Sequence, residues 1–327
     1  MYNPININYS NGWFLLMNGI NSFIKINERS TLPELDIFLS TDGNYIPYCG
    51  VCIYSIHHNN KSKDLRFHIL TKHVSADDIS KIEEIGAQVF VYDIDDSYFL
   101  ELKTSERFPI SIYYRVIAPR IVSSESSKIL YLDCDILCDG DISNLINLDM
   151  GEKIMAAAFE DDIKDVDENL FKKLNSKKYF NSGVLLIDNK KWISNNVEKK
   201  FMDELSTGDY CYPDQDSLNV IFDGDVFPLS NDFNFIPKNS GSVKKNKPVL
   251  IHYAGSTKPW SKAAMPSYHV NLYKKYFQSS PWRYTPYKEP SNDREYIKYG
   301  VCLLMRFSLL KGTLFLCRGF YKTLRRK

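Results

Sequence analysis

The feature that most constrains this sequence is a short apolar run that ends in two carboxylates. Ile129–Leu132 is apolar, and Asp133 and Asp135 follow it one residue apart. Carboxylates beside a hydrophobic strand are costly to bury unless they are paired or bind a cation. Residues i and i+2 of a strand share a face, so both side chains can converge on one ion. Mg²⁺ and Mn²⁺ prefer oxygen ligands and share them with phosphates, so the run predicts a metal site at a strand end, ready to hold a diphosphate.

Two simpler interpretations of the same run compete with the metal site. In the first, Asp133 and Asp135 only cap the helix that follows. In the second, they begin a calcium loop of the EF-hand type, but counting from Asp133 puts Cys138 where glycine is needed and Asn144 where glutamate is needed. Asp141 suits the capping interpretation better, because a helical turn follows it. We favour the metal–diphosphate interpretation, but an Asp-x-Asp pair is common and needs support elsewhere in the chain.

Short apolar runs alternate with helical patterns along most of the chain. Strands are expected over Leu35–Ser40, Leu65–Leu70 and Gln88–Tyr92, and near Met155–Phe159, Gly183–Ile187, Val226–Pro228 and Pro248–His252. Helices are expected over Ile46–His58, over Ser75–Ile85, which opens with a capping pattern, and over Ser111–Arg120. This alternation predicts parallel βαβ units. Ligands of open α/β sheets bind at the carboxyl ends of the strands, and we expect the motifs at such ends.

The charge of the chain is divided unevenly. Residues 294–327 hold nine Lys or Arg and one acidic residue, a net charge of +8, which leaves −7 for the rest of a chain whose total is +1. An acidic body argues against nucleic-acid binding, and a basic tail points to an anionic surface. Apolar residues of the tail recur every seven positions, at Tyr296, Leu303, Leu310, Cys317 and Leu324. A helix through this region is expected to lie in a membrane interface, with a helix packed on the body as the alternative.

The number and spacing of the cysteines indicate a reducing compartment. Seven scattered cysteines, an odd number, fit free thiols in the cytoplasm. Cys49 and Cys52 have redox spacing, but they lie early in an expected helix, and we expect them to be buried core residues.

No basic segment precedes an apolar core at the N-terminus, so we expect no signal peptide. No apolar run approaches the length of a membrane span, because Arg306 and Lys311 interrupt the best candidate.

Several segments occur together in the order and at the separations typical of one known family. They are Asp36–Tyr45, Arg66–Leu70, Tyr113–Arg115, Tyr131–Asp135, Tyr179–Leu186, Tyr212–Asp216 and Ile251–Trp260. On these segments the chain resembles a glycosyltransferase of family eight, close to the lipopolysaccharide-core hexosyltransferases of Gram-negative bacteria. The resemblance covers roughly residues 35 to 285. The segments are highly specific as a set, although each alone is not.

The resemblance implies a fold and a function. The expected fold is a GT-A-like α/β fold for nucleotide-diphospho-sugar transfer, with a mixed, mainly parallel sheet and a basic C-terminal helical tail. The expected parts are an N-terminal extension (1–33), a catalytic domain (34–290) and an amphipathic membrane-associating tail (291–327). The expected reaction is metal-dependent transfer of glucose or galactose from a UDP-sugar to a lipopolysaccharide-core saccharide, with retention and an α linkage. The expected location is cytoplasmic, peripheral on the inner face of the bacterial inner membrane.

The resemblance also assigns residues to the site. Asp133, Asp135 and His252 hold Mn²⁺ or Mg²⁺, and His252 favours Mn²⁺ because that ion accepts imidazole. The donor contacts are Ser40, Asp42, Asn44, Tyr45, Arg115, Asp133, Asp135, Asn181, Ser182, Gly255 and Lys258. Asp42 lies near the uracil and Tyr45 stacks on it, while Asn181 and Ser182 contact sugar hydroxyls. The catalytic residues are Asp214, near the transferred sugar, and Gln215, beside the anomeric carbon and opposite the leaving group. Glutamine is a poor nucleophile, so we do not expect a covalent intermediate on it.

Each of these assignments has a simpler structural alternative. Asp42 can cap the helix that follows an Asp-Gly turn. Arg115 can form a surface salt bridge, and Asp214 can be an acidic helix cap. His252 can be a structural histidine at a strand end. The matching segments around each residue favour the functional interpretation.

Two other classes of function compete with sugar transfer. The chain could bind a nucleotide sugar or a glycan without turnover, or it could hydrolyse the nucleotide sugar with water as the acceptor. Among transferases, another surface glycan or a protein could be the acceptor. We prefer the transferase because every residue of the expected metal site is present.

Overall fold

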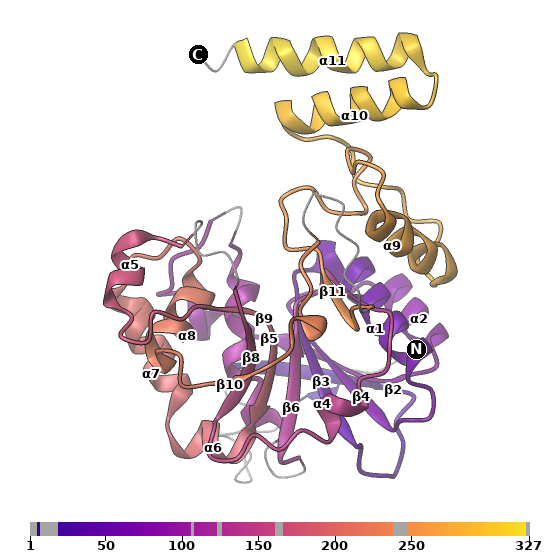
Figure 1. Cartoon of the computed structure of the whole chain (residues 1–327). Helices are drawn as coiled ribbons and strands as arrows, with labels where there is room; N and C mark the ends of the chain where they lie inside the picture. The colour runs from indigo at the N-terminus through magenta and orange to yellow at the C-terminus, as the bar shows by residue number, and fades with distance from the viewer. Residues whose placement is uncertain are drawn as a thin grey trace. The chain divides into compact units, whose positions relative to one another are not determined.

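The structure is a computed structural model that describes residues 5–6, 19–105, 108–122, 126–160, 166–237 and 247–324. The chain divides into two compact units. The first is formed by Met1–Phe235 and Asn246–Ile251, and the second by Ile236–Lys245 and His252–Lys327. Figure 1 shows the elements of both units along the chain.

The first unit is built on one large mixed sheet. Its strands are β1 (Ile5–Asn6), β2 (Ile20–Ile26), β3 (Leu35–Ser40), β4 (Leu65–Thr71), β5 (Gln88–Ile94), β6 (Lys128–Leu132), β8 (Met155–Phe159), β9 (Phe180–Asp188) and β10 (Phe227–Pro228). Their order is β1-β2-β5-β4-β3-β6-β9-β8-β10. The four central strands from β5 to β6 are parallel, whereas β9 runs antiparallel to both β6 and β8, and β2 is antiparallel to β5. The expected mixed, mainly parallel α/β sheet is confirmed.

A second, two-stranded sheet and a set of helices accompany the large sheet. The second sheet pairs β7 (Ile136–Cys138) with β11 (Leu250–His252). The α-helices are α1 (Ile46–Asn59), α2 (Ala76–Glu84), α3 (Ala118–Ile121), α4 (Ser143–Ile146), α5 (Glu168–Lys173), α6 (Asn189–Ser194), α7 (Val197–Thr207) and α8 (Pro213–Phe222). The 3-10 helices are η1 (Gly43–Tyr45), η2 (Asp96–Phe99), η3 (Ile110–Ile117) and η4 (Asn231–Phe233).

Strands that are buried on both faces agree well with the sequence prediction. β3 and β8 have the expected bounds, and β4 and β5 extend slightly beyond them. β2, which lies inside the expected N-terminal extension, is a strand of the sheet that the sequence analysis does not predict. The Asn- and Ser-rich start of that extension lies largely outside the described residues.

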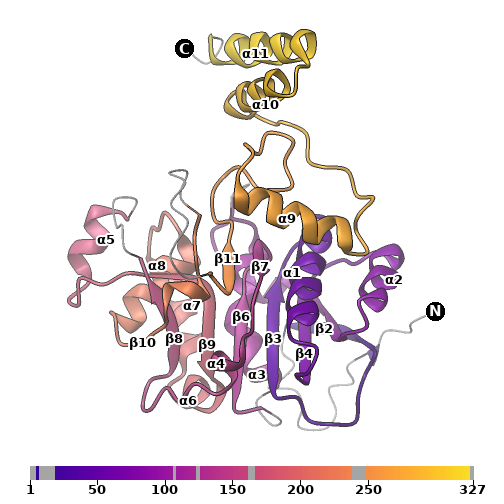
Figure 2. The same cartoon turned by 45° about the vertical axis from the view of Figure 1, so that its right-hand side comes forward.

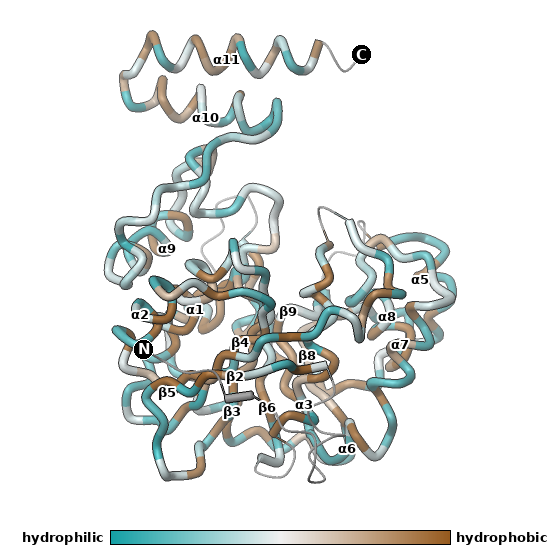
Figure 3. The backbone as a smooth tube through the Cα atoms, turned by 180° about the vertical axis from the view of Figure 1, so that it is seen from behind, coloured by the Kyte–Doolittle hydropathy of each residue, from teal (hydrophilic) through white to brown (hydrophobic). Residues whose placement is uncertain are grey.

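Helices cover both faces of the large sheet. On one face, Phe38 and Tyr131 from the sheet share a core with Tyr113 of η3, Trp192 of α6 and Phe201 of α7. Figure 2 shows α1 across β3 and β4 on the near side, where Cys49 and Cys52 are buried as expected of core residues. In Figure 3 the hydrophobic colour gathers on the strands of the sheet.

The second unit carries the basic tail as two helices. It contains α9 (Tyr268–Ser279), α10 (Asp293–Met305) and α11 (Leu309–Leu324), and the last two lie side by side as a hairpin. The expected basic helical tail is confirmed, but it consists of two helices rather than one continuous helix. Phe307, with φ of +60°, lies in the reversal between α10 and α11. No helix in the described part of the chain has the length and apolar composition that a bilayer crossing requires.

Glycine contacts hold the two tail helices close together. A Cβ atom on Gly300 of α10 would lie 2.8 Å from the Leu316 side chain and 3.0 Å from the backbone oxygen of Gly312. A Cβ atom on Gly319 would lie 2.6 Å from the side chain of Ile297. Such distances exclude any larger residue without movement of the helices. The hairpin, which we define as residues 293–324, packs backbone against backbone at these points.

A buried ionic network ties the parallel strands together near their amino ends. Asp36 of β3 is fully buried and accepts hydrogen bonds from Arg66 Nε (2.5 Å) and from Ser126 Oγ. His68 Nε2 lies 2.7 Å from the same carboxylate, and its Nδ1 lies 3.0 Å from the Tyr92 hydroxyl. Burial alone would raise the pKa of Asp36, but the hydrogen bonds and charges of His68 and Arg66 lower it to about 2.

We expect Asp36→Asn to destabilise the protein and to change how stability depends on pH. The folded pKa of Asp36 is about 2 against 3.8 for the ordinary group, so its charge contributes about 2 kcal/mol above about pH 4, and this is lost as the pH falls toward 2. The amide of Asn keeps an acceptor oxygen for Arg66 but carries no charge, so we expect Asp36→Asn to cost about 2 kcal/mol at pH 7. Urea unfolding between pH 7 and pH 3 measures both effects.

Asp77→Asn is the matched control, because Asp77 is an exposed aspartate paired with Lys81 on a helix surface. It should change the free energy of unfolding by less than about 0.5 kcal/mol. The network would be unimportant for stability if Asp36→Asn kept the wild-type free energy of unfolding at pH 7.

Candidate active site

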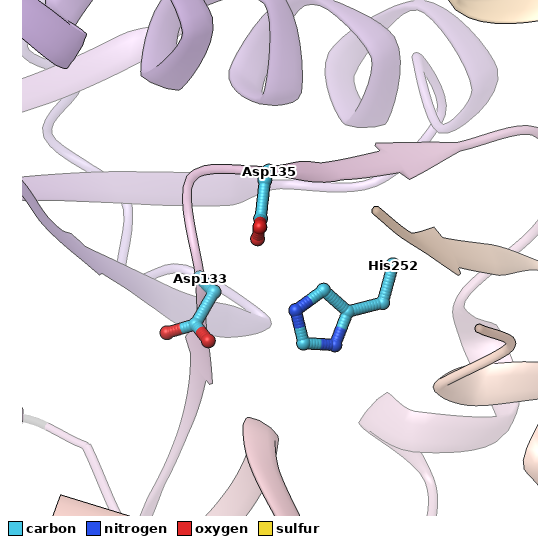
Figure 4. Close-up of side chains that lie close together, drawn as sticks. All are labelled: Asp133, Asp135 and His252. Carbon is cyan, nitrogen blue, oxygen red and sulfur yellow. The ribbon is translucent and has the colours of Figure 1, made fainter. Parts of the chain in front are cut away.

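Three potential metal ligands come together where β6 and β11 end. Asp133 and Asp135 follow β6, and His252 is the last residue of β11, which pairs with β7. One ligand atom from each residue lies within 4.8 Å of the others. Figure 4 shows the three side chains directed toward a common space. Two carboxylates and one imidazole form a donor set that suits a divalent ion such as Mn²⁺.

The position of Asp133 is fixed by both neighbours of β6. Its backbone N–H donates to the Gly183 carbonyl oxygen at 2.9 Å, which continues the ladder with β9. The Tyr131 hydroxyl, two residues earlier on the same face, lies 3.3 Å from Asp133 Oδ1 and 2.6 Å from the Ser40 hydroxyl at the end of β3. Burial raises the pKa of Tyr131, so its hydroxyl keeps the proton that these hydrogen bonds need. Ser40 is therefore linked to the metal carboxylate through Tyr131.

Arg115 is buried at the centre of the site. Its Nη2 donates to Asp133 Oδ1 at 2.9 Å, and its Nη1 lies 3.0 Å from Asp214 Oδ2. Nη1 also donates to the carbonyl oxygen and the hydroxyl of Ser182. Its guanidinium lies over the Tyr131 ring, 4.5 Å from the centroid. Burial alone would lower the pKa of Arg115, but the acidic groups around it, Asp214 foremost, raise it. The alternative of a surface salt bridge is wrong.

The two expected catalytic residues lie in the first turn of α8. Asp214 is buried and forms the ion pair with Arg115, whereas the helix-capping contact belongs to Asp216, which accepts from the Tyr212 backbone N–H at 2.8 Å. Gln215 Oε1 accepts from the backbone N–H of Ser182 at 3.0 Å. The structure thus brings Asp214, Gln215 and Ser182 together beside Arg115.

Asn181 connects the beginning of β9 to a carboxylate that the sequence analysis does not identify. Its Nδ2 donates to Glu160 Oε1 at 3.2 Å, and its Oδ1 accepts from Asn234 Nδ2 at 2.9 Å. Glu160 directly follows β8, so a carboxylate after an apolar run is again the signal that could have identified it. Because β9 is antiparallel, Asn181 and Ser182 reach the site from the amino end of their strand, whereas the sequence analysis expects the motifs at carboxyl ends.

The remaining donor residues form local contacts. Asp42 Oδ1 accepts from the Asn44 backbone N–H at 2.8 Å and so caps η1, which bears out its structural alternative. Asn44 is exposed, and the Tyr45 ring packs edge-on against Tyr48. Contacts of these residues with a base stay a prediction.

Gly255 and Lys258 belong to the second unit and follow His252 by three and six residues. Lys258 Nζ donates to the Tyr253 carbonyl oxygen at 2.8 Å. A Cβ atom on Gly255 would meet no other atom within 4 Å, so packing does not require glycine there. Their contacts with a diphosphate stay predictions.

Known proteins share both the sequence and the fold of this chain. It is 31% identical to the lipopolysaccharide 1,2-glucosyltransferase of Escherichia coli K12, with 88% of this chain and 92% of that protein covered. It is 28% identical to the lipopolysaccharide 1,3-galactosyltransferase of Salmonella typhimurium, with 80% and 83% covered. The crystal structure of the galactosyltransferase LgtC with donor and acceptor sugar analogs has a TM-score of 0.66 and 25% identity, and covers 75% of this chain and 96% of that one.

The similarity to LgtC confirms the expected GT-A-like fold. The sequence also matches glycosyl transferase family 8 over residues 36–264, a range that contains Asp133, Asp135, His252, Arg115 and Gln215. More than half of the chain lies in this range, so the chain belongs to glycosyl transferase family 8 and is a glycosyltransferase.

Proposed function

We propose that the protein is a metal-dependent, retaining hexosyltransferase. It moves glucose or galactose from a UDP-sugar to a lipopolysaccharide-core saccharide and forms an α linkage. The acceptor class rests on the relatives, whose names are lipopolysaccharide glucosyl- and galactosyltransferases. The group Asp133, Asp135 and His252 is the single observation that carries the proposal, because it provides a cation site among residues suited to a sugar donor.

The donor set fits Mn²⁺ or Mg²⁺. Carboxylate oxygens suit both ions, and the imidazole nitrogen favours Mn²⁺. A divalent ion bound there supplies positive charge to the diphosphate of the leaving group. In this proposal Lys258 adds a second charge to the phosphates as a point cation.

The protein side chains orient the donor sugar. Arg115 holds Asp133 and Asp214 in place through a buried ion-pair network, and these fixed groups need no rearrangement when the sugar binds. Gln215 lies beside the anomeric carbon, and its amide oxygen faces the positive charge that develops there. The acceptor hydroxyl attacks from the face that the diphosphate leaves, and the departing phosphate takes its proton.

We also propose that the hairpin holds the enzyme on the cytoplasmic face of the inner membrane. Phe307 and Leu310, at the end where α10 turns into α11, are 91% and 89% exposed. Basic side chains lie among the apolar ones, at Arg306, Lys311, Arg318 and Lys322. Exposed apolar side chains with interspersed cations suit an interface rich in anionic lipid. A membrane-held enzyme meets a membrane-anchored acceptor at a raised effective concentration.

We expect the protein to transfer hexose from UDP-glucose or UDP-galactose to truncated lipopolysaccharide-core acceptors with an α linkage. Incubation with a panel of UDP-sugars and core acceptors, followed by determination of the anomeric configuration by NMR, tests this. A β-linked product would exclude the retaining mechanism, and release of UDP that does not depend on the acceptor would indicate hydrolysis.

We expect transfer to require a divalent ion at the Asp133–Asp135–His252 group. Chelation should abolish transfer, and Mn²⁺ should restore it better than Ca²⁺, because Mn²⁺ accepts imidazole. Asp135→Ala should lower kcat/KM at least about 100-fold, since it removes a metal ligand. Titration calorimetry with Mn²⁺ should record weaker binding by the variant, independently of activity.

Asp141→Ala is the control, because Asp141 belongs to the same run but is exposed and caps the turn at Ser143. It should keep wild-type transfer and Mn²⁺ binding. Near wild-type transfer by Asp135→Ala would mean that the metal site is assigned to the wrong residues.

We expect the turn of the hairpin to be required for membrane binding. The double variant Phe307→Asn and Leu310→Gln should weaken co-sedimentation with phosphatidylglycerol-containing vesicles at least about tenfold. It replaces two large apolar side chains that would otherwise move from water into the membrane interface on binding. Asparagine tolerates the positive φ of residue 307, so the turn is preserved. Tyr284→Asn is the control, since Tyr284 is 85% exposed but lies outside the hairpin. Equal vesicle binding by the paired variant and the control would argue that the hairpin has another role.

A further inference from the structure

The amide of Gln215 is held at both of its ends. Its Oε1 accepts a hydrogen bond from the backbone N–H of Ser182 at 3.0 Å. Its Nε2 donates to the Tyr179 hydroxyl at 3.0 Å. The Tyr179 hydroxyl in turn donates a short hydrogen bond to Asp216 Oδ1. These contacts form one chain from Asp216 through Tyr179 and Gln215 to Ser182.

The chemistry of the partners sets the direction of every hydrogen bond in this chain. The backbone N–H of Ser182 can only donate, so it requires the amide oxygen opposite it. An ionised Asp216 can only accept, so the proton of Tyr179 points to Asp216 and the phenol oxygen accepts from the amide nitrogen. If the amide of Gln215 were flipped, its Nε2 would face the backbone N–H of Ser182, so two donors would oppose each other. Its Oε1 would then face the Tyr179 hydroxyl, which already donates its proton to Asp216. The chain therefore selects one amide orientation.

Burial makes this selection strong. Tyr179 and Asp216 are each 2% exposed, so water does not compete for their hydrogen bonds. Burial and the charge of Asp216 raise the pKa of Tyr179, which keeps its proton. The second oxygen of Asp216 accepts from the backbone N–H of Tyr212, at the start of α8. Tyr179 itself directly precedes β9.

We infer that Tyr179, held by Asp216, is a positioning residue for Gln215 and determines which end of its amide faces the reacting sugar. The inference rests on the proposed function, in which Gln215 lies beside the anomeric carbon. Partial positive charge on that carbon is stabilised by the amide oxygen and destabilised by the amide N–H groups. A fixed amide is thus polarised correctly before the donor binds, which is the condition for electrostatic stabilisation of a transition state.

A purely structural role makes a different prediction. If the pair of Tyr179 and Asp216 only fastened α8 to β9, its loss would lower the melting temperature, and any effect on kcat would not depend on Gln215. Positioning through Gln215 predicts instead that the effect on kcat disappears once the amide has been removed.

The test is a double-mutant cycle on transfer from the UDP-sugar donor. Tyr179→Phe keeps the ring in the core and removes the hydroxyl. We expect it to lower kcat about 10- to 100-fold and to change the donor KM less than about twofold, as is typical when a partner behind a reacting group is lost. In the Gln215→Ala background, the same substitution should lower kcat by less than about twofold.

Tyr98→Phe is the matched control, because the Tyr98 hydroxyl also donates to a carboxylate, that of Glu198 at 2.5 Å. It should leave kcat within about twofold of wild type in both backgrounds. Should Tyr179→Phe not fold, Asp216→Ala takes its place in the cycle, since it removes the acceptor of the Tyr179 proton. Asp216→Asn, which keeps an acceptor oxygen, should cost less than Asp216→Ala.

The outcomes separate the inference from the proposed function. If Gln215→Ala impairs kcat and Tyr179→Phe lowers kcat by the same factor in both backgrounds, or leaves it unchanged, the positioning role is overturned and the role of Gln215 stands. If Gln215→Ala keeps the wild-type kcat, the proposed role of Gln215 itself fails, and the positioning role fails with it.

Discussion

The candidate site depends on one buried guanidinium group, that of Arg115. Arg115 joins three parts of the chain, because its guanidinium contacts Asp133 after β6, Ser182 in β9 and Asp214 in α8. A charge taken out of water is stabilised only by close partners, so none of these contacts can be lost cheaply. Without this guanidinium, the carboxylates of Asp133 and Asp214 would lose the positive charge that lies between them and would repel each other. Asp133, Ser182 and Asp214 therefore form one electrostatic unit around Arg115.

Sequence predicts the parts of the fold that local burial determines. β3 and β8 are buried along their length, and such strands appear as continuous apolar runs. β2 is absent from the sequence prediction because Ile20–Ile26 mixes apolar residues with Asn, Ser and Lys, and its pairing with β5 joins segments far apart in the chain. Apolar residues of the tail recur every seven positions on both sides of Phe307, although the backbone reverses there. A hydropathy pattern contains no information about the positive φ of Phe307, so the sequence predicts one helix where the structure has two.

The residues of the candidate site also divide into those whose role the sequence predicts and those whose role it does not. Asp133, Asp135 and Gln215 are assigned roles from sequence, whereas the roles of the residues that contact them are identified only by tertiary contacts. Tyr131 had a detectable signal, since it lies two residues before Asp133 and so on the same strand face. Tyr179 lies in a matching segment, but no local pattern tells which distant side chain receives its proton. Sequence therefore identifies candidate groups, while their hydrogen-bond directions come from the fold.

The α10–α11 hairpin uses glycines for its internal contacts and leaves large apolar side chains outside. Met305, Phe307, Leu309, Leu310 and Leu314 are all exposed. In a dilute aqueous preparation such a surface favours self-association and adsorption, because each copy can cover the apolar side chains of another. Mild detergent during purification would cover the same side chains and so reduce such self-association.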